Sequence, residues 1–134
     1  MRCFETKHFS RKELECKCGK CKFPGMDKNF MDLLEAVRTD PDLNRPMSIS
    51  SAYRCPEHNR NVSSTGPEGP HTTGKAIDVR LSGRDAHLFL GIAMGYDFAG
   101  VGIAQKGSHG SRFIHLDILD QEETSGPRPW IWSY

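Results

Sequence analysis

The chain has 134 residues, of which 37% are hydrophobic and 26% are charged, and its formal net charge is +1. This length suits one domain, and the composition is that of a soluble protein with a single core rather than a membrane-embedded one. The balance of 18 basic against 17 acidic residues gives no reason to expect nucleic acid or an anionic membrane as a partner. We therefore expect one domain over residues 1–134 that acts as a monomer.

Residues 1–25 are polar, rich in cysteine and interrupted by glycine and proline, which predicts an irregular N-terminal segment. No apolar run follows the first charged residues, so no signal peptide is visible and we expect synthesis in the cytoplasm. The whole chain has five cysteines. An odd number in a chain without a visible signal argues against a simple disulfide scaffold.

The next stretch predicts two helices with a short strand between them. Asp27 or Asn29 can cap a helix that ends near Thr39, because its apolar residues recur at helical spacing. Residues 47–53 alternate in polarity, which favours a strand. Proline is tolerated at a first helical position, so Pro56 is expected to open a short helix through Val62. The apolar positions of the first helix are Phe30, Leu33, Leu34 and Val37.

In the second half of the chain strands alternate with a helix and long loops. The aromatic tail 130–134 is expected to pack on the body of the protein. This order predicts an α+β fold with one small, mostly antiparallel sheet and flanking helices. The expected elements are a loop over 63–74, a strand over 75–81, a helix over 84–95 capped by Ser82, and strands over 100–104 and 112–119.

Three residues in this region have the chemistry of metal ligands. His71 ends the glycine-rich loop, while Asp78 and His115 lie in predicted strands on the faces opposite the apolar positions. A carboxylate in the middle of a strand is costly unless it is paired or bound to a metal. Each residue alone has an ordinary explanation: an exposed histidine, an aspartate paired with an arginine, a histidine bonded in the core. The set of three favours one zinc ion with an open fourth position.

The sequence also resembles a known family in three segments. These are Ser51-Ala-Tyr-Arg-Cys-Pro-Glu-His-Asn59, His71-x-x-Gly-x-Ala-x-Asp78 and Phe113-Ile-His-Leu-Asp117. They resemble the D-alanyl-D-alanine carboxypeptidase family of zinc peptidases, which shares a fold with the hedgehog signalling domain. The resemblance spans about residues 9–134. It departs at Pro70, where the family usually has serine, and that departure affects a residue next to a ligand rather than the ligand itself.

The resemblance implies zinc bound by His71, Asp78 and His115, and a hedgehog/DD-peptidase-like fold. It further implies hydrolysis of peptidoglycan stem peptides by a metal-activated water, either as a carboxypeptidase or as an endolysin-type endopeptidase. Two other possibilities stay open, a zinc-stabilised wall-binding module without turnover and a virion component that digests the wall locally. The small size and the absence of a visible signal suggest a phage or prophage product that another component releases to the cell wall.

Three further residues are candidates for the reaction. Arg54 matches an arginine of the family and can hold a substrate carboxylate or a developing oxyanion; a surface ion pair is the alternative. His109 lies on a glycine-rich turn and is the preferred candidate for the general base, although an exposed turn histidine is nearly as plausible. Asp117 shares the face of His115 and is expected to orient that imidazole, with the role of base as its alternative.

A cysteine cluster stands apart from these motifs. Cys16, Cys18 and Cys21 have metal-like spacing but supply only three thiols, and Cys55 can complete a four-thiolate site. The alternative is a set of disulfides, if the protein works outside the cell. We therefore expect a structural role for the cluster, with a second zinc as one possibility.

Overall fold

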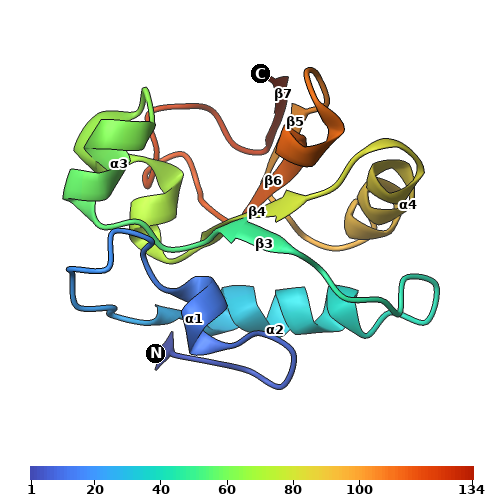
Figure 1. Ribbon diagram of the computed structural model, residues 1–134, viewed down its shortest axis with the longest axis horizontal. Helices are drawn as coiled ribbons and strands as arrows, with labels where there is room; N and C mark the ends of the chain where they lie inside the picture. The colour runs from blue at the N-terminus through green and yellow to red at the C-terminus, as the bar shows by residue number, and fades with distance from the viewer.

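The computed structural model describes residues 1–134 and contains four α-helices, a five-stranded sheet and a two-stranded sheet (Figure 1). All neighbours in the larger sheet are antiparallel except β5 and β7, which are parallel. The predicted α+β fold with a small, mostly antiparallel sheet is confirmed. In spatial order the five strands are β3 (Ile49–Ser51), β4 (Ala76–Arg80), β6 (Phe113–Asp117), β5 (Gly100–Ala104) and β7 (Trp130–Ser133).

The register of this sheet separates an apolar face from a polar one. Ile77 is paired with Leu116, and Leu116 in turn with Val101, so these three side chains share the face that joins the core. Because successive side chains of a strand point to opposite faces, their neighbours Asp78 and His115 face the other way. Those two are themselves paired across β4 and β6.

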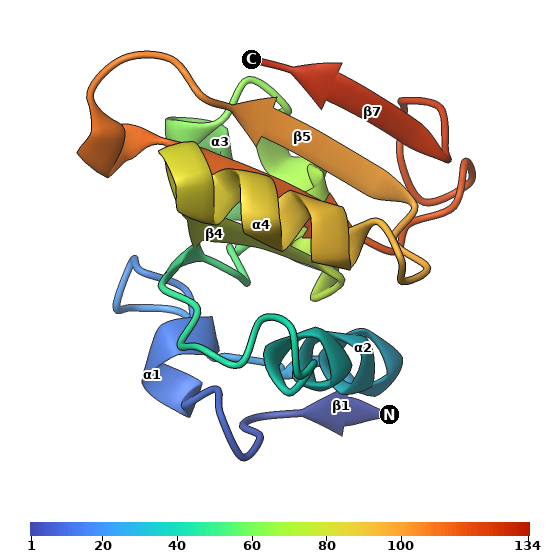
Figure 2. The same ribbon diagram turned by 90° about the vertical axis from the view of Figure 1, so that its right-hand side faces the viewer.

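Helices lie on both faces of the sheet. Figures 1 and 2 show α4 (Gly83–Ala93) on one side and α3 (Pro56–Val62) on the other, with the strands between them. Figure 1 shows the helix α2 (Lys28–Arg38) beneath β3, and this helix buries Phe30 and Leu34 in the same core. The N-cap of α2 is Asp27, whose Oδ2 accepts from the Phe30 amide at 3.0 Å. No helix is long and apolar enough to cross a membrane.

The N-terminal segment is more regular than its composition predicts. A capping box between Ser10 and Glu13 starts the short helix α1 (Arg11–Leu14), a pattern that satisfies two backbone donors of a first turn. The strand β1 (Arg2–Cys3) pairs with β2 (Met26–Asp27).

The predicted loop and tail also contain regular structure. Two 3₁₀ turns, Gly66–Glu68 and Pro70–Thr73, interrupt the loop 63–74. The aromatic tail packs on the body as expected, and it does so as the edge strand β7, which the sequence analysis did not anticipate.

Candidate metal centre and substrate pocket

The first candidate ligand, His71, is fixed by the backbone of the segment that follows β3. It lies in the turn Pro70–Thr73, is 5% exposed, and its Nδ1 lies 2.7 Å from the carbonyl oxygen of Ala52. The Arg54 amide donates to the His71 carbonyl at 3.0 Å. These two bonds hold the imidazole with its Nε2 directed at the polar face of the sheet.

The other two candidate ligands meet His71 through the pairing of β4 with β6. Asp78 Oδ1 lies 3.2 Å from His71 Nε2 and 3.1 Å from His115 Nδ1. The donor atoms of the three residues all lie within 4.8 Å of one another, and all three residues are buried. The structure thus brings together the His71, Asp78 and His115 that the sequence singled out.

The hydrogen bonds on the far side of each imidazole decide its tautomer. The Ala52 carbonyl can only accept, so His71 Nδ1 carries the proton and Nε2 keeps its lone pair. His115 Nε2 lies 2.7 Å from the Asp117 carboxylate, so in the same way its Nδ1 lone pair faces Asp78. When both imidazoles are neutral, two lone pairs and a carboxylate oxygen converge on one point, and a cation resolves their repulsion. The chemistry of this donor set fits zinc, for which histidine nitrogen and aspartate oxygen are ordinary ligands.

The electrostatics of the three groups follow from burial and from their mutual contacts. Burial lowers the pKa of His71, although Asp78 acts to raise it. The lowered pKa keeps this imidazole neutral, as metal binding requires. Burial acts to raise the pKa of Asp78, but His71 and His115 outweigh it and hold that pKa well below its usual range. Burial likewise acts to lower the pKa of His115, and the carboxylates of Asp117 and Asp78 raise it. A bound cation would take the place of that extra proton.

Asp117 is placed to orient His115 rather than to act as a base. It is fully buried, and its two oxygens receive Arg128 Nε at 3.0 Å and Arg128 Nη2 at 2.9 Å in addition to the imidazole. The Leu119 amide also donates to it, at 3.2 Å. Burial acts to raise the pKa of Asp117, whereas His115 and Arg128 lower it, so the carboxylate stays charged. Its oxygens have partners and do not line the pocket, which favours the orienting role over its alternative.

Arg54 lies on the other side of Asp78. Its Nη2 contacts Asp78 Oδ2 at 3.4 Å, its Nε donates to Ser51 Oγ at 3.0 Å, and its Nη1 donates to Asn59 Oδ1 at 3.0 Å. A guanidinium has five N–H donors, so the two that these contacts leave free are available to a ligand. Because Arg54 also lines the pocket, those donors are near the metal donor set.

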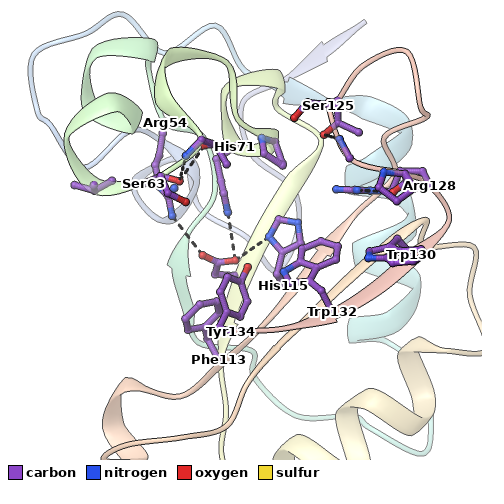
Figure 3. Close-up of a pocket in the computed structure, with 18 residues that line it drawn as sticks. Arg54, Ser63, His71, Phe113, His115, Ser125, Arg128, Trp130, Trp132 and Tyr134 are labelled. Atoms are coloured by element: carbon purple, nitrogen blue, oxygen red, sulfur yellow. Dashed lines mark hydrogen bonds and ion pairs between the residues drawn. The ribbon is translucent and has the colours of Figure 1, made fainter.

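A pocket of about 660 Å³ opens beside the three candidate ligands (Figure 3). Its walls include Arg54, Arg128 and the aromatic residues of β7. Trp132 lies between the His115 ring, at 5.1 Å, and the Arg128 guanidinium, at 4.9 Å. Tyr134 packs against the Phe113 ring at 5.0 Å, and its ring lies 6.3 Å from that of Trp132 on the pocket wall (Figure 3). Its phenol stays protonated at neutral pH and is therefore a donor in this pocket.

The structure does not bring His109 to this site. His109 is exposed on the β5–β6 connection, its Nδ1 lies 3.3 Å from Ser82 Oγ, and it does not line the pocket. The connection would have to fold over the metal donors before this imidazole could act there. Its role as general base stays a prediction.

The sequence analysis assigned no role to three residues near the site. Asn59, fully buried in α3, joins Arg54 to the loop through Thr65 Oγ1 and the Gly66 carbonyl. It is the last residue of the first family-like segment, and that position was the signal available for it. Tyr134 ends the aromatic tail that was expected to pack on the body, and no quoted motif contains Arg128.

A buried His–Asp–His donor set at the edge of an open pocket, on an α+β scaffold, is the arrangement of a metal-dependent hydrolase. The chain belongs to the Peptidase M15 family, whose model matches residues 7–117. These are zinc peptidases similar to D-alanyl-D-alanine carboxypeptidases, so the chain is a zinc metallopeptidase that acts on a peptide substrate. No curated protein and no solved structure matches the chain.

Proposed function

We propose that this zinc metallopeptidase hydrolyses peptide bonds in the stem peptides of peptidoglycan, and that it binds its catalytic zinc through His71, Asp78 and His115. The observation that carries the proposal is the convergence of three metal-donor atoms beside a pocket with cationic and aromatic walls. When bound, zinc lowers the pKa of a water molecule and polarises a carbonyl. Because peptidoglycan forms the bacterial cell wall, we expect the protein to act there.

The walls of the pocket suit a short anionic peptide. Arg54 and Arg128 both line it, and the only carboxylate in its lining is Asp78, which belongs to the metal donors. Stem peptides carry carboxylates along a short chain, and a guanidinium with two free donors can grip one of them in a bidentate manner. The same donors can instead stabilise an oxyanion as it forms.

The chain's own residues divide the remaining tasks. Asp117 holds His115 in the tautomer that presents Nδ1, and the Ala52 carbonyl does the same for Nε2 of His71. Arg54 positions Asp78 through its Nη2 contact and offers its free donors to substrate. Tyr134 also lines the pocket, where its phenol can donate to a substrate oxygen or to the leaving nitrogen.

The decisive experiment is digestion of purified peptidoglycan followed by mass analysis of the fragments. We expect zinc-dependent fragments that a chelator abolishes; release of free D-alanine marks a carboxypeptidase, and larger peptide fragments mark an endopeptidase. His115→Ala should lose both metal and activity. Arg54→Ala should keep the metal and lose about 100- to 1000-fold in turnover, the usual cost of removing an oxyanion donor.

Arg45→Ala is the matched control, because Arg45 forms an exposed pair with Asp85 on the surface. This variant should digest walls at the unchanged rate. A protein that binds zinc at the His71 site but releases nothing from any wall type would refute the peptidase proposal and favour the wall-binding module.

A further inference from the structure

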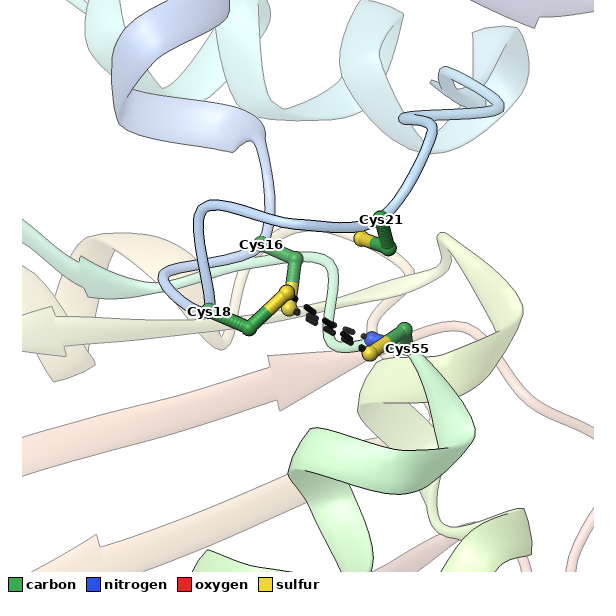
Figure 4. A group of neighbouring side chains, drawn as sticks. All are labelled: Cys16, Cys18, Cys21 and Cys55. Atoms are coloured by element: carbon green, nitrogen blue, oxygen red, sulfur yellow. Dashed lines mark hydrogen bonds between the residues drawn. The ribbon is translucent and has the colours of Figure 1, made fainter.

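Four cysteines meet at the N-terminal end of α3, and none of them lines the substrate pocket. Cys16, Cys18 and Cys21 come from the connection between α1 and β2, and Cys55 comes from the end of the β3–α3 connection. Their sulfur atoms all lie within 4.8 Å of one another (Figure 4). Neither the peptidase chemistry nor its pocket uses these residues.

The spacing of the sulfur atoms matches that of ligands around one ion. Cys16 Sγ and Cys18 Sγ lie 3.8 Å and 3.9 Å from Cys55 Sγ. In a tetrahedral zinc site with Zn–S bonds of about 2.3 Å, two sulfur atoms are about 3.8 Å apart. A disulfide bond needs about 2.05 Å, and all five cysteines are free.

The surroundings of the cluster supply hydrogen-bond donors to its sulfur atoms. Backbone amides donate to three of these positions: Cys55 N to Cys16 Sγ at 3.3 Å, His58 N to Cys55 Sγ at 3.4 Å, and Lys20 N to Cys18 Sγ at 3.4 Å. Such N–H···S bonds stabilise negative charge on sulfur. Lys20 also lines the shallow pocket of about 320 Å³ over the cluster, which places a positive charge near a four-thiolate complex of net charge −2.

We propose that Cys16, Cys18, Cys21 and Cys55 bind a second, structural zinc ion. All four coordination positions come from the protein, which is the closed arrangement of structural rather than catalytic sites. The ion would fasten the irregular segment 16–21 to the β3–α3 connection. Because Cys55 directly follows Arg54, the same ion would fix the backbone of the residue that contacts Asp78.

The test separates the two metal sites by mutation and by the type of ligand. Purified full-length protein should contain about two zinc atoms per chain, His115→Ala about one, and Cys21→Ser about one. X-ray absorption of the His115→Ala protein should show an all-sulfur shell at about 2.3 Å. In Cys21→Ser the remaining zinc should have nitrogen and oxygen neighbours. Cobalt substituted into His115→Ala should show the absorption of thiolate-to-metal charge transfer.

Cys3→Ser is the matched control, because Cys3 lies outside the cluster and its sulfur has its one hydrogen bond with the Glu5 carbonyl. It should keep both zinc atoms. If Cys21→Ser does not fold, the wild-type metal content and the His115→Ala spectrum still decide the question. Zinc without sulfur neighbours in His115→Ala, or cysteines found paired by intact mass, would overturn the proposal while leaving the proposed peptidase function untouched.

Discussion

In the proposed zinc site, Asp117 would act on the metal through His115 without touching the ion. Its carboxylate binds the outer nitrogen of His115 at 2.7 Å and itself accepts hydrogen bonds from Nε and Nη2 of Arg128. This arrangement sets the tautomer of the imidazole and increases its basicity. The residue lies two positions after a ligand, so its place in the strand already directs it to the same face.

We predict that Asp117→Asn weakens zinc binding at the His71 site by about 10- to 100-fold, the usual effect of removing a carboxylate behind a ligand histidine. The neutral amide no longer holds the proton on Nε2, so Nδ1 is less often the free donor. Competition against a chromophoric chelator measures the affinity. Asp97→Asn is the control, since Asp97 is exposed. Equal affinities in both variants would rule out the positioning role.

At the scale of elements, β5 makes room for the site. Gly100 is paired with Asp117, and Gly102 is paired with both His115 and Trp132. A Cβ at Gly100 would overlap the Asp117 carboxylate, and one at Gly102 would lie 2.7 Å from the Trp132 ring. The two glycines therefore allow a buried carboxylate and an indole to lie over the centre of the sheet.

This geometry predicts that Gly100→Ala destabilises the fold more than Gly102→Ala does. Asp117 is buried and held by four hydrogen bonds, so it cannot move aside, and overpacking of such a site costs about 1–3 kcal/mol. Trp132 is only partly buried and can shift when Gly102 becomes alanine. Chemical denaturation of the two variants and the parent measures the difference. A smaller loss of unfolding free energy for Gly100→Ala than for Gly102→Ala would contradict the packing argument.

At the scale of the whole molecule, the N-terminal third supports the loop that carries His71. Arg2 Nη1 donates to the Thr73 carbonyl at 3.1 Å, and the Asp27 amide donates to the Gly74 carbonyl at 2.9 Å. The Glu35 carboxylate of α2 in turn anchors the residues before α1. It accepts from Thr6 Oγ1 at 2.6 Å and from the His8 amide at 2.9 Å.

These anchoring bonds make stability depend on pH in a defined direction. Burial acts to raise the pKa of Glu35, but the bonds from His8 and Thr6 outweigh it and lower that pKa below the ordinary value of 4.5. The carboxylate therefore stabilises the fold above pH 4.5, and its contribution is lost as the pH falls through the lowered value. We predict that Glu35→Gln costs about 1–3 kcal/mol at neutral pH and that the difference from the parent shrinks in acid.

Urea denaturation at a series of pH values checks this prediction. Glu122→Gln is the control, since Glu122 is exposed and its side chain has no hydrogen bond. A Glu35→Gln deficit that stays constant from neutral to acid pH would show that the charge of Glu35 is not its cause.

The sequence by itself determined the parts that depend on local order. The helix 28–38 and the helix 56–62 follow from capping residues and apolar spacing, and the strands 76–80 and 113–117 follow from alternation. Alternation also placed Asp78 and His115 on the face opposite the core. Motif spacing then singled out His71 as their partner, and the family comparison agrees with the fold and the zinc-peptidase class.

Only the tertiary structure decided which distant groups complete the site. Arg128 and Tyr134 reach the pocket because β7 joins β5 in parallel, a pairing that depends on contacts far apart in the chain. The same pairing lets Arg128 occupy the oxygens of Asp117, while the β5–β6 connection holds His109 outside the pocket. Local sequence patterns predict which face of a strand a side chain occupies. Which residues lie next to that side chain depends on the pairing of strands that are far apart in the sequence. In this protein that pairing decides which residues are positioned to orient His115 and which line the substrate pocket.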